Sequence, residues 1–134
     1  MANADLKEIV TKYKTIAVVG LSPDQGKPSF EVAAYLQRAG YRIIPVNPAC
    51  QEILGERCYP TLADIPGEVE IVDVFRRAEF LPEIVEQAIA KGAKVVWMQE
   101  GIVNAPAAAR AEQAGLAVVM DRCLLKEHHK LAPR

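Results

Sequence analysis

The fold class that the sequence predicts is α/β: a single domain built on a parallel sheet with helices on both faces. Its 134 residues match the usual size of one core, and 51% of them are apolar while 25% are charged. Short apolar runs rich in β-branched residues alternate with segments of helical spacing. Because this alternation requires crossovers between parallel strands, we expect a three-layer, Rossmann-like, doubly wound parallel β-sheet of about five strands.

The first half of the chain predicts two helices and two strands. Apolar residues at helical spacing in 4–13 indicate a leading amphipathic helix, and the β-branched run Thr15–Val19 indicates a buried strand. A helix is expected from about Ser29, as its N-cap, to the next glycine. The second strand is Tyr41–Val46, with Pro45 at its exit because proline donates no ladder hydrogen bond.

The second half repeats the pattern. Helices are expected over about 80–91 and after Asn104, an N-cap residue, and one short helix is expected in the tail from Asp121. The connection 47–69 is long and holds only a short helical candidate near Thr61–Ile65; loops of such length are often functional. The expected strands of this half are Glu70–Phe75, Lys94–Met98 and Leu116–Met120.

Composition excludes several classes of function. A formal net charge of -1 argues against a nucleic-acid binder that relies on bulk positive charge. The apolar runs are strand-sized, shorter than the ~20 residues that cross a bilayer, so no membrane partner is expected. The N-terminus shows no signal-peptide pattern, and the irregular spacing of three cysteines suits reduced thiols, so we expect a cytoplasmic protein.

Ligands of open parallel sheets bind beyond the carboxyl ends of the strands, where the strand order reverses. This rule selects segments 20–28, 46–50, 75–77, 98–102 and 120–123. In the first, GLSPDQGKP, the glycines allow close approach of the backbone, and the next helix offers free N–H groups. A serine and a lysine add a donor and a cation, so the loop favours phosphate over a simple turn.

The phosphate ligand is not expected to be NAD. The G-x-G-x-x-G motif is absent, and the exit of the second strand, PVNPAC, lacks the acidic residue that would hold the ribose. Arg76 and Arg77 follow an apolar strand and suit phosphate groups, with solvated arginines as the alternative. Val74 and Phe75 before them are suited to cover an adenine ring.

The segments GLSPDQGKPSF, YLQRAGYRIIPVNP, GERCYPTLADIP, VDVFRR and VWMQEGIVN together resemble the small stand-alone CoA-binding proteins. These share the CoA-binding Rossmann-type domain of the succinyl-CoA synthetase α subunit. The resemblance covers about 14–123, and it implies one CoA-binding domain within 1–134. It also implies coenzyme A or an acyl-CoA as the ligand.

The resemblance assigns residues to parts of the ligand. The loop residues placed at the CoA phosphates are Gly20, Ser22, Pro23, Gly26 and Lys27. Those that would line the nucleotide, flank adenine and phosphate, or lie near the pantetheine are Pro45, Asn47, Pro48, Val74, Phe75, Arg76, Gln99 and Gly101. The synthetase has a lysine soon after its second strand, but NPACQ has none, which leaves Arg76, Arg77 or Lys27 to replace it.

No catalytic set is evident. His128 and His129 lie in a polar tail and are expected to be solvated, and Cys123 is expected to be a quiet thiol. Glu100 has no partner acid or nucleophile in the sequence, and Asp73 lies inside an apolar strand where a structural role is as reasonable as any other.

The sequence therefore predicts a CoA-binding protein, acting as a sensor, carrier or regulatory module without its own catalysis. Two alternatives stay open: an acyl-CoA- or NAD(P)-dependent enzyme with an unrecognised catalytic set, and an interaction domain with a vestigial pocket. The expected partner is a small CoA ligand, with no nucleic acid and no membrane. A homo-oligomer or a protein partner is left open.

Overall fold

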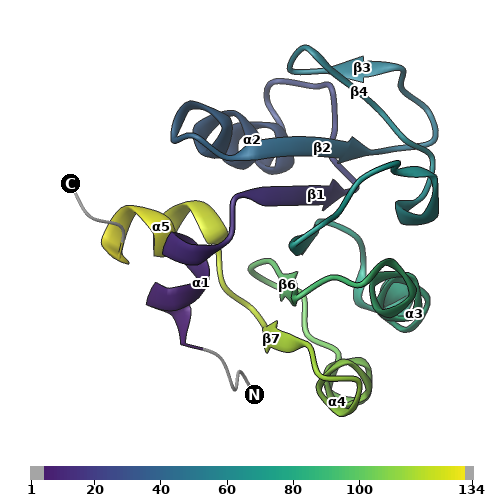
Figure 1. The fold of residues 1–134 in the computed structure, drawn as a ribbon. Helices are drawn as coiled ribbons and strands as arrows, with labels where there is room; N and C mark the ends of the chain where they lie inside the picture. Colours follow the sequence, from purple (N-terminus) through teal and green to yellow (C-terminus); the bar gives the residue numbers. More distant parts are fainter. Residues whose placement is uncertain (1–4, 132–134) are drawn as a thin grey trace.

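The computed structural model describes residues 5–131, which are built around a parallel sheet of five strands (Figure 1). The strand order is β2-β1-β5-β6-β7, and every neighbouring pair is parallel. This confirms the predicted fold class and strand number. The strands are β1 (Thr15–Val19), β2 (Arg42–Val46), β5 (Ile71–Val74), β6 (Val95–Met98) and β7 (Ala117–Val119).

Helices cover both faces of this sheet (Figure 1). Side chains alternate between the faces along β1: Ile16 and Val18 pack with one set of helices, and Ala17 and Val19 with the other. Both faces are buried, which is why the strands are continuous apolar runs. One face carries α1 (Leu6–Lys12), α2 (Pro28–Arg38) and α5 (Leu124–Leu131); the other carries α3 (Leu81–Lys91), α4 (Ala105–Gln113) and the 3-10 helix η1 (Leu62–Asp64).

Several helices begin and end where the sequence indicates. Gly92 caps α3 in the left-handed conformation, with φ of 79°. The Asn104 side chain accepts a hydrogen bond from the backbone N–H of Ala107 at 3.0 Å, as expected of an N-cap. The leading helix also forms, although residue 4 of its predicted range lies outside the described residues.

Two local predictions are wrong. Ser29 is not the N-cap of α2, because Pro28 fits the first helical position and places Lys27 at the cap. The Ser29 hydroxyl instead accepts a hydrogen bond from the backbone N–H of Ser22 at 3.0 Å. Pro45 lies inside β2, opposite Val18, rather than at its exit. Since β2 is an edge strand, the missing N–H leaves no ladder bond unmade.

The long connection contains a β-hairpin that the sequence did not indicate. Its strands β3 (Glu52–Ile53) and β4 (Glu56–Arg57) pair antiparallel around a tight turn in which Leu54 and Gly55 both have positive φ, 57° and 76°. The Ile53 side chain is buried with those of α2, and Gln37 of α2 donates to the Leu54 carbonyl at 3.0 Å. The hairpin is therefore fixed to the body of the protein.

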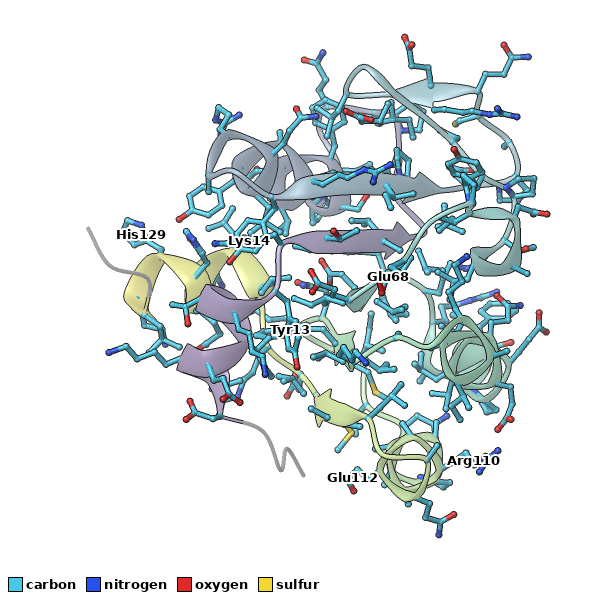
Figure 2. The ribbon with its side chains drawn as sticks, in the orientation of Figure 1. Tyr13, Lys14, Glu68, Arg110, Glu112 and His129 are labelled. Atoms are coloured by element: carbon cyan, nitrogen blue, oxygen red, sulfur yellow. The ribbon has the colours of Figure 1, made fainter. Side chains whose placement is uncertain are left out.

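The C-terminal helix α5 corrects the prediction that His128 is solvated. His128 is half-buried, its Nδ1 lies 2.9 Å from the Tyr35 hydroxyl, and its ring makes edge contacts with Tyr35 and Tyr41. Burial, followed by the charge of Lys14, lowers the pKa of His128. Figure 2 shows Lys14 at the amino end of β1, so this contact lies at the amino edge of the sheet.

Candidate functional site

The strand order reverses between β1 and β5, which makes their carboxyl ends the place where a ligand is expected. Gly20 follows β1 here with φ of 90°, and its N–H donates to the Val46 carbonyl at 3.0 Å. A Cβ atom at this position would lie 2.6 Å from the Phe75 carbonyl oxygen. Only glycine allows the exits of β1 and β5 to approach this closely.

The loop 20–28 is ordered by its own side chains. Ser22 Oγ accepts from the N–H of Asp24 at 3.0 Å, and Asp24 Oδ1 accepts from the N–H of Gly26 at 2.9 Å. The sequence alone did not point to Asp24. Its carboxylate occupies the Gly26 N–H, a backbone donor that a phosphate bound in this loop would use. A phosphate that uses the Gly26 N–H must displace this carboxylate.

The first turn of α2 adds donors to the same edge. No side chain of the described residues caps it, and Lys27 at the N-cap position is exposed. Uncapped N–H groups and the helix dipole both favour an anion at this end. Pro23 and Lys27 are exposed in the loop, where the sequence placed them.

The exit of β5 distinguishes the two arginines. Arg76 is half-buried; its Cδ would lie 3.0 Å from a Cβ on Gly20, and its guanidinium carbon is 4.2 Å from the centre of the Phe80 ring. Arg77 is exposed and has a glutamate carboxylate 3.9 Å from its Nε atom. The guanidinium carbon of Arg77 also lies 5.5 Å from the Phe80 ring centre, so Arg76 differs in its burial and in its packing against Gly20 at the reversal point. Phe80, in the 3-10 helix η2 (Ala78–Phe80), was not predicted.

Two hollows open beside Arg76. The first, which we call the α3 cavity, has a volume of about 220 Å³ and lies between the exits of β1 and β2 and the start of α3. It is lined by predicted site residues together with residues of the long loop and of α3 that the sequence did not indicate. Its lining includes Val46, Pro48, Pro60, Thr61, Arg76, Phe80 and Ile84.

The second, which we call the β5–β6 hollow, has a volume of about 370 Å³ and brings Gly101 together with the β5 exit. Arg76 is the residue that lines both. A cation between two recesses suits a ligand with phosphate groups at its middle and larger groups on either side. The lining of this hollow is Phe75, Arg76, Arg77, Ala78, Gly101 and Ile102.

Other predicted site residues are buried in strands or make hydrogen bonds within the protein. The Asn47 amide donates to the Leu21 carbonyl at 2.9 Å and accepts from the N–H of Ala49 at 2.8 Å, so it ties the β2 exit to the first loop. Pro45 and Val74 are buried in their strands. These residues shape the edge of the sheet, while their contact with a ligand stays a prediction.

Asp73 and Gln99 form a buried pair just behind the edge. Gln99 Nε2 donates to Asp73 Oδ1 at 2.7 Å, and the side chains are 3% and 0% exposed for Gln99 and Asp73 respectively. Asp73 Oδ2 is buried, and no hydrogen-bond partner for it is found among residues 5–131. Burial raises the pKa of Asp73 to about 7, against the opposing effect of the Gln99 hydrogen bond.

The candidate catalytic groups are engaged elsewhere. Glu100 is exposed and forms an ion pair with Lys126, with 3.0 Å between Nζ and Oε2, and Cys123 is buried in the core. Within residues 5–131, no cluster of three or more metal-ligating side chains is found. Over the same residues, no helix is both long and apolar enough to cross a membrane.

Comparison with known proteins identifies the family. A family model described as a CoA binding domain matches residues 14–129, which include every segment of this edge. The chain belongs to the CoA-binding domain family. The predicted resemblance is confirmed.

Relatives of the CoA-binding domain family occur both as small proteins and within large ligases. The uncharacterized protein YneT of Bacillus subtilis is 42% identical over 127 residues, which cover 95% of this chain and 94% of YneT. A hypothetical protein from Pyrococcus horikoshii has a solved structure with a TM-score of 0.93 and 46% identity, covering 96% of this chain and 91% of that one.

The ADP-forming acetate–CoA ligase II of Archaeoglobus fulgidus is 39% identical over 83 residues, which cover 60% of this chain. The match spans only 12% of the length of that ligase. This CoA-binding domain is thus similar to one small part of a much larger enzyme.

Proposed function

We propose that this protein binds coenzyme A or an acyl-CoA at the carboxyl edge of its sheet. The observation that carries the proposal is the family match over 14–129, which spans all the strand exits that meet at the reversal point. The chain acts as one CoA-binding domain whose core is about 14–123. Gly20, Gly26 and Ser22, with the start of α2, receive the phosphates.

The two hollows suit the two ends of such a ligand. Pro48, Phe80 and Ile84 give the α3 cavity apolar walls of the kind that cover a purine base. Arg76 stands between the hollows and supplies a guanidinium group for the phosphates or for the ribose phosphate. The β5–β6 hollow, with Gly101 on its wall, then takes the pantetheine arm.

The protein acts as a sensor, carrier or regulatory module rather than as a catalyst. The groups that would serve as base or nucleophile are already engaged: Glu100 with Lys126, Cys123 in the core, and His128 with Tyr35. This arrangement favours a role in which the ligand is bound and released unchanged.

Replacement of Arg76 tests the site. A charge-assisted hydrogen bond contributes about 1.5–3 kcal/mol, so R76A should weaken CoA binding about 10- to 100-fold by titration calorimetry. R42A is the matched control, because it removes the same charge from an exposed side chain at the amino end of β2, and its Kd should stay within about twofold. Equal losses in both variants would refute the assigned role of Arg76. The absence of saturable binding of CoA and of an acyl-CoA panel would refute the function.

A further inference from the structure

In the buried pair Asp73–Gln99, the carboxyl group of Asp73 has an unusual position. Asp73 lies in the central strand β5, between Val18 of β1 and Trp97 of β6, two residues before Phe75 at the site. Its neighbours on both strands are apolar and fully buried. A carboxyl group with one unpartnered oxygen in such surroundings destabilises the fold, which indicates a use in function.

Neighbouring charged groups do not cause the raised pKa of Asp73. On the elements that pack on its face, ionisable side chains in buried or half-buried positions include Tyr35, Tyr41, Cys58, Cys123, Glu127 and His128. None of them is among the causes that shift the pKa of Asp73, which are burial and the Gln99 hydrogen bond. Glu127 is itself paired with Arg122 and Lys130, at 3.6 and 3.4 Å.

We propose that Asp73 is a proton-linked positioning residue: it takes up a proton from solvent when the anionic ligand binds, and thereby sets the orientation of the Gln99 amide at the site. The inference rests on the proposed function, since it concerns the same ligand. It adds the prediction that the affinity for CoA depends on pH, which neither the family match nor the strand topology implies.

The ligand favours the neutral form of Asp73 for two reasons. Its phosphates bring negative charge to the edge immediately beyond β5, and like charges raise the pKa of a carboxyl group. The ligand also covers the exits of β5 and β6 and removes the nearest water, which adds to the desolvation of an ion. Because the pKa is about 7 in the free protein, binding near neutral pH draws a proton onto Asp73.

The proton acts through Gln99. An ionised carboxylate only accepts hydrogen bonds, so it holds the Gln99 amide nitrogen, as in the 2.7 Å contact seen here. A neutral carboxyl group can donate to the amide oxygen instead. The amide nitrogen is then free to donate to the ligand, whose phosphate and carbonyl oxygens are acceptors. Asp73 therefore controls which end of the Gln99 amide the ligand meets.

The test is calorimetry of CoA binding in buffers of different ionisation enthalpy, which counts the protons taken up. With a pKa of about 7 for Asp73, linkage predicts about one proton taken up at pH 8 and close to none at pH 6. Above pH 7, the Kd should then rise by up to about tenfold per pH unit. Titration of the CoA phosphates contributes equally to every variant.

D73N is the matched control, and its proton uptake at pH 8 should be lower than that of the wild type by about one. Q99M removes the hydrogen bond that lowers the pKa of Asp73, so its uptake at pH 8 should be smaller than in the wild type. Equal uptake in wild type and D73N would overturn the inference and leave CoA binding intact. Failure of wild type to bind CoA between pH 5.5 and 8.5 would overturn both proposals.

A second measurement covers the case in which D73N does not fold. The side-chain carboxyl carbon of Asp73 in labelled wild-type protein can be titrated by NMR with and without CoA. The midpoint should rise by about two pH units on binding, which is the shift that an uptake of about one proton at pH 8 requires. An unchanged or lowered midpoint would overturn the inference.

Discussion

The two edges of the sheet use their polar side chains differently. At the amino edge, Glu70 Oε1 accepts from the backbone N–H groups of Lys14 and Thr15 at 2.8 and 3.1 Å. The Tyr41 hydroxyl donates to the Val10 carbonyl. These hydrogen bonds hold α1 and the strand ends together.

The carboxyl edge differs, because two of its polar side chains are not paired in this way. Asp73 Oδ2 has no partner, and among the described residues Arg76 stacks on Phe80 rather than pairing with a carboxylate. Hydrogen bonds made within the fold stabilise it, whereas polar groups that wait for a ligand give up stability for binding. Under the proposed function, side chains of the same chemical type would then have opposite effects on stability at the two edges, and substitutions test this.

The largest expected effect is at Gly20. G20A places a Cβ atom 2.6 Å from the Phe75 carbonyl in a backbone conformation with φ of 90°. Overlap and the left-handed conformation together should lower the free energy of unfolding by about 4 kcal/mol. Urea denaturation measures it.

G115A at the amino edge is the control. Gly115 has φ of 93°, but no atom of the described part of the chain lies within 4 Å of a Cβ atom there. Only the conformational cost applies, so the loss should be about 1 kcal/mol. Equal losses at the two positions would mean that the close approach of β1 and β5 does not require glycine.

The second effect is a pH dependence at Asp73. A folded pKa of about 7, against about 3.9 in the unfolded chain, means that the folded protein binds the extra proton. Stability from this group is therefore present below about pH 4 and is lost as the pH rises to 7. D73N should be more stable than the wild type at pH 8, and this advantage should be smaller at pH 5 by about 3 kcal/mol, since the wild type loses that much between pH 5 and pH 7.

Replacement of Glu70, whose carboxylate is hydrogen-bonded at the amino edge, should change the stability in the opposite direction. E70Q weakens the hydrogen bonds to the N–H groups of Lys14 and Thr15, and should destabilise the protein at pH 8 by about 1 kcal/mol. Denaturation at pH 5 and pH 8 measures both variants. A stabilising E70Q, or a D73N that is less stable than the wild type at pH 8, would remove the contrast between the edges.

The smallest effect is at Asp24 in the first loop. D24N keeps an oxygen that accepts from the Gly26 N–H but removes a negative charge from the phosphate position. Exposed charges are screened, so CoA should bind about two- to threefold more tightly in calorimetry at low salt. E112Q makes the same charge change on α4 (Figure 2) and should leave the Kd unchanged. A D24N that binds more weakly would argue against phosphate at Gly26.

Much of this fold is contained in local sequence patterns. The runs of Thr15–Val19 and Lys94–Met98 are continuous and apolar because both faces of their strands are buried, and that pattern needs no knowledge of the neighbours. Asn104 and Gly92 act on their own helix ends, so their roles were also predictable. The β3–β4 hairpin was missed because strands of two residues show no alternation.

The site could be predicted only in part. Strand topology placed Gly20, Arg76 and Gly101 at one edge, since each follows the end of a strand. The contribution of Phe80 and Thr61 to the α3 cavity depends on how the long loop folds back toward α3. The contact of His128 with Tyr35 depends likewise on tertiary packing, which no spacing in the tail encodes.

Titration of labelled protein with CoA, followed by amide NMR shifts, tests the central claim most directly. The claim predicts saturable shifts at the carboxyl edge, at Gly20, Gly26, Arg76 and Gly101. The amino-edge amides of Lys14, Glu70 and Gly115 should stay unchanged. Shifts centred on the amino edge, or no saturable shifts with CoA or any acyl-CoA, would contradict it.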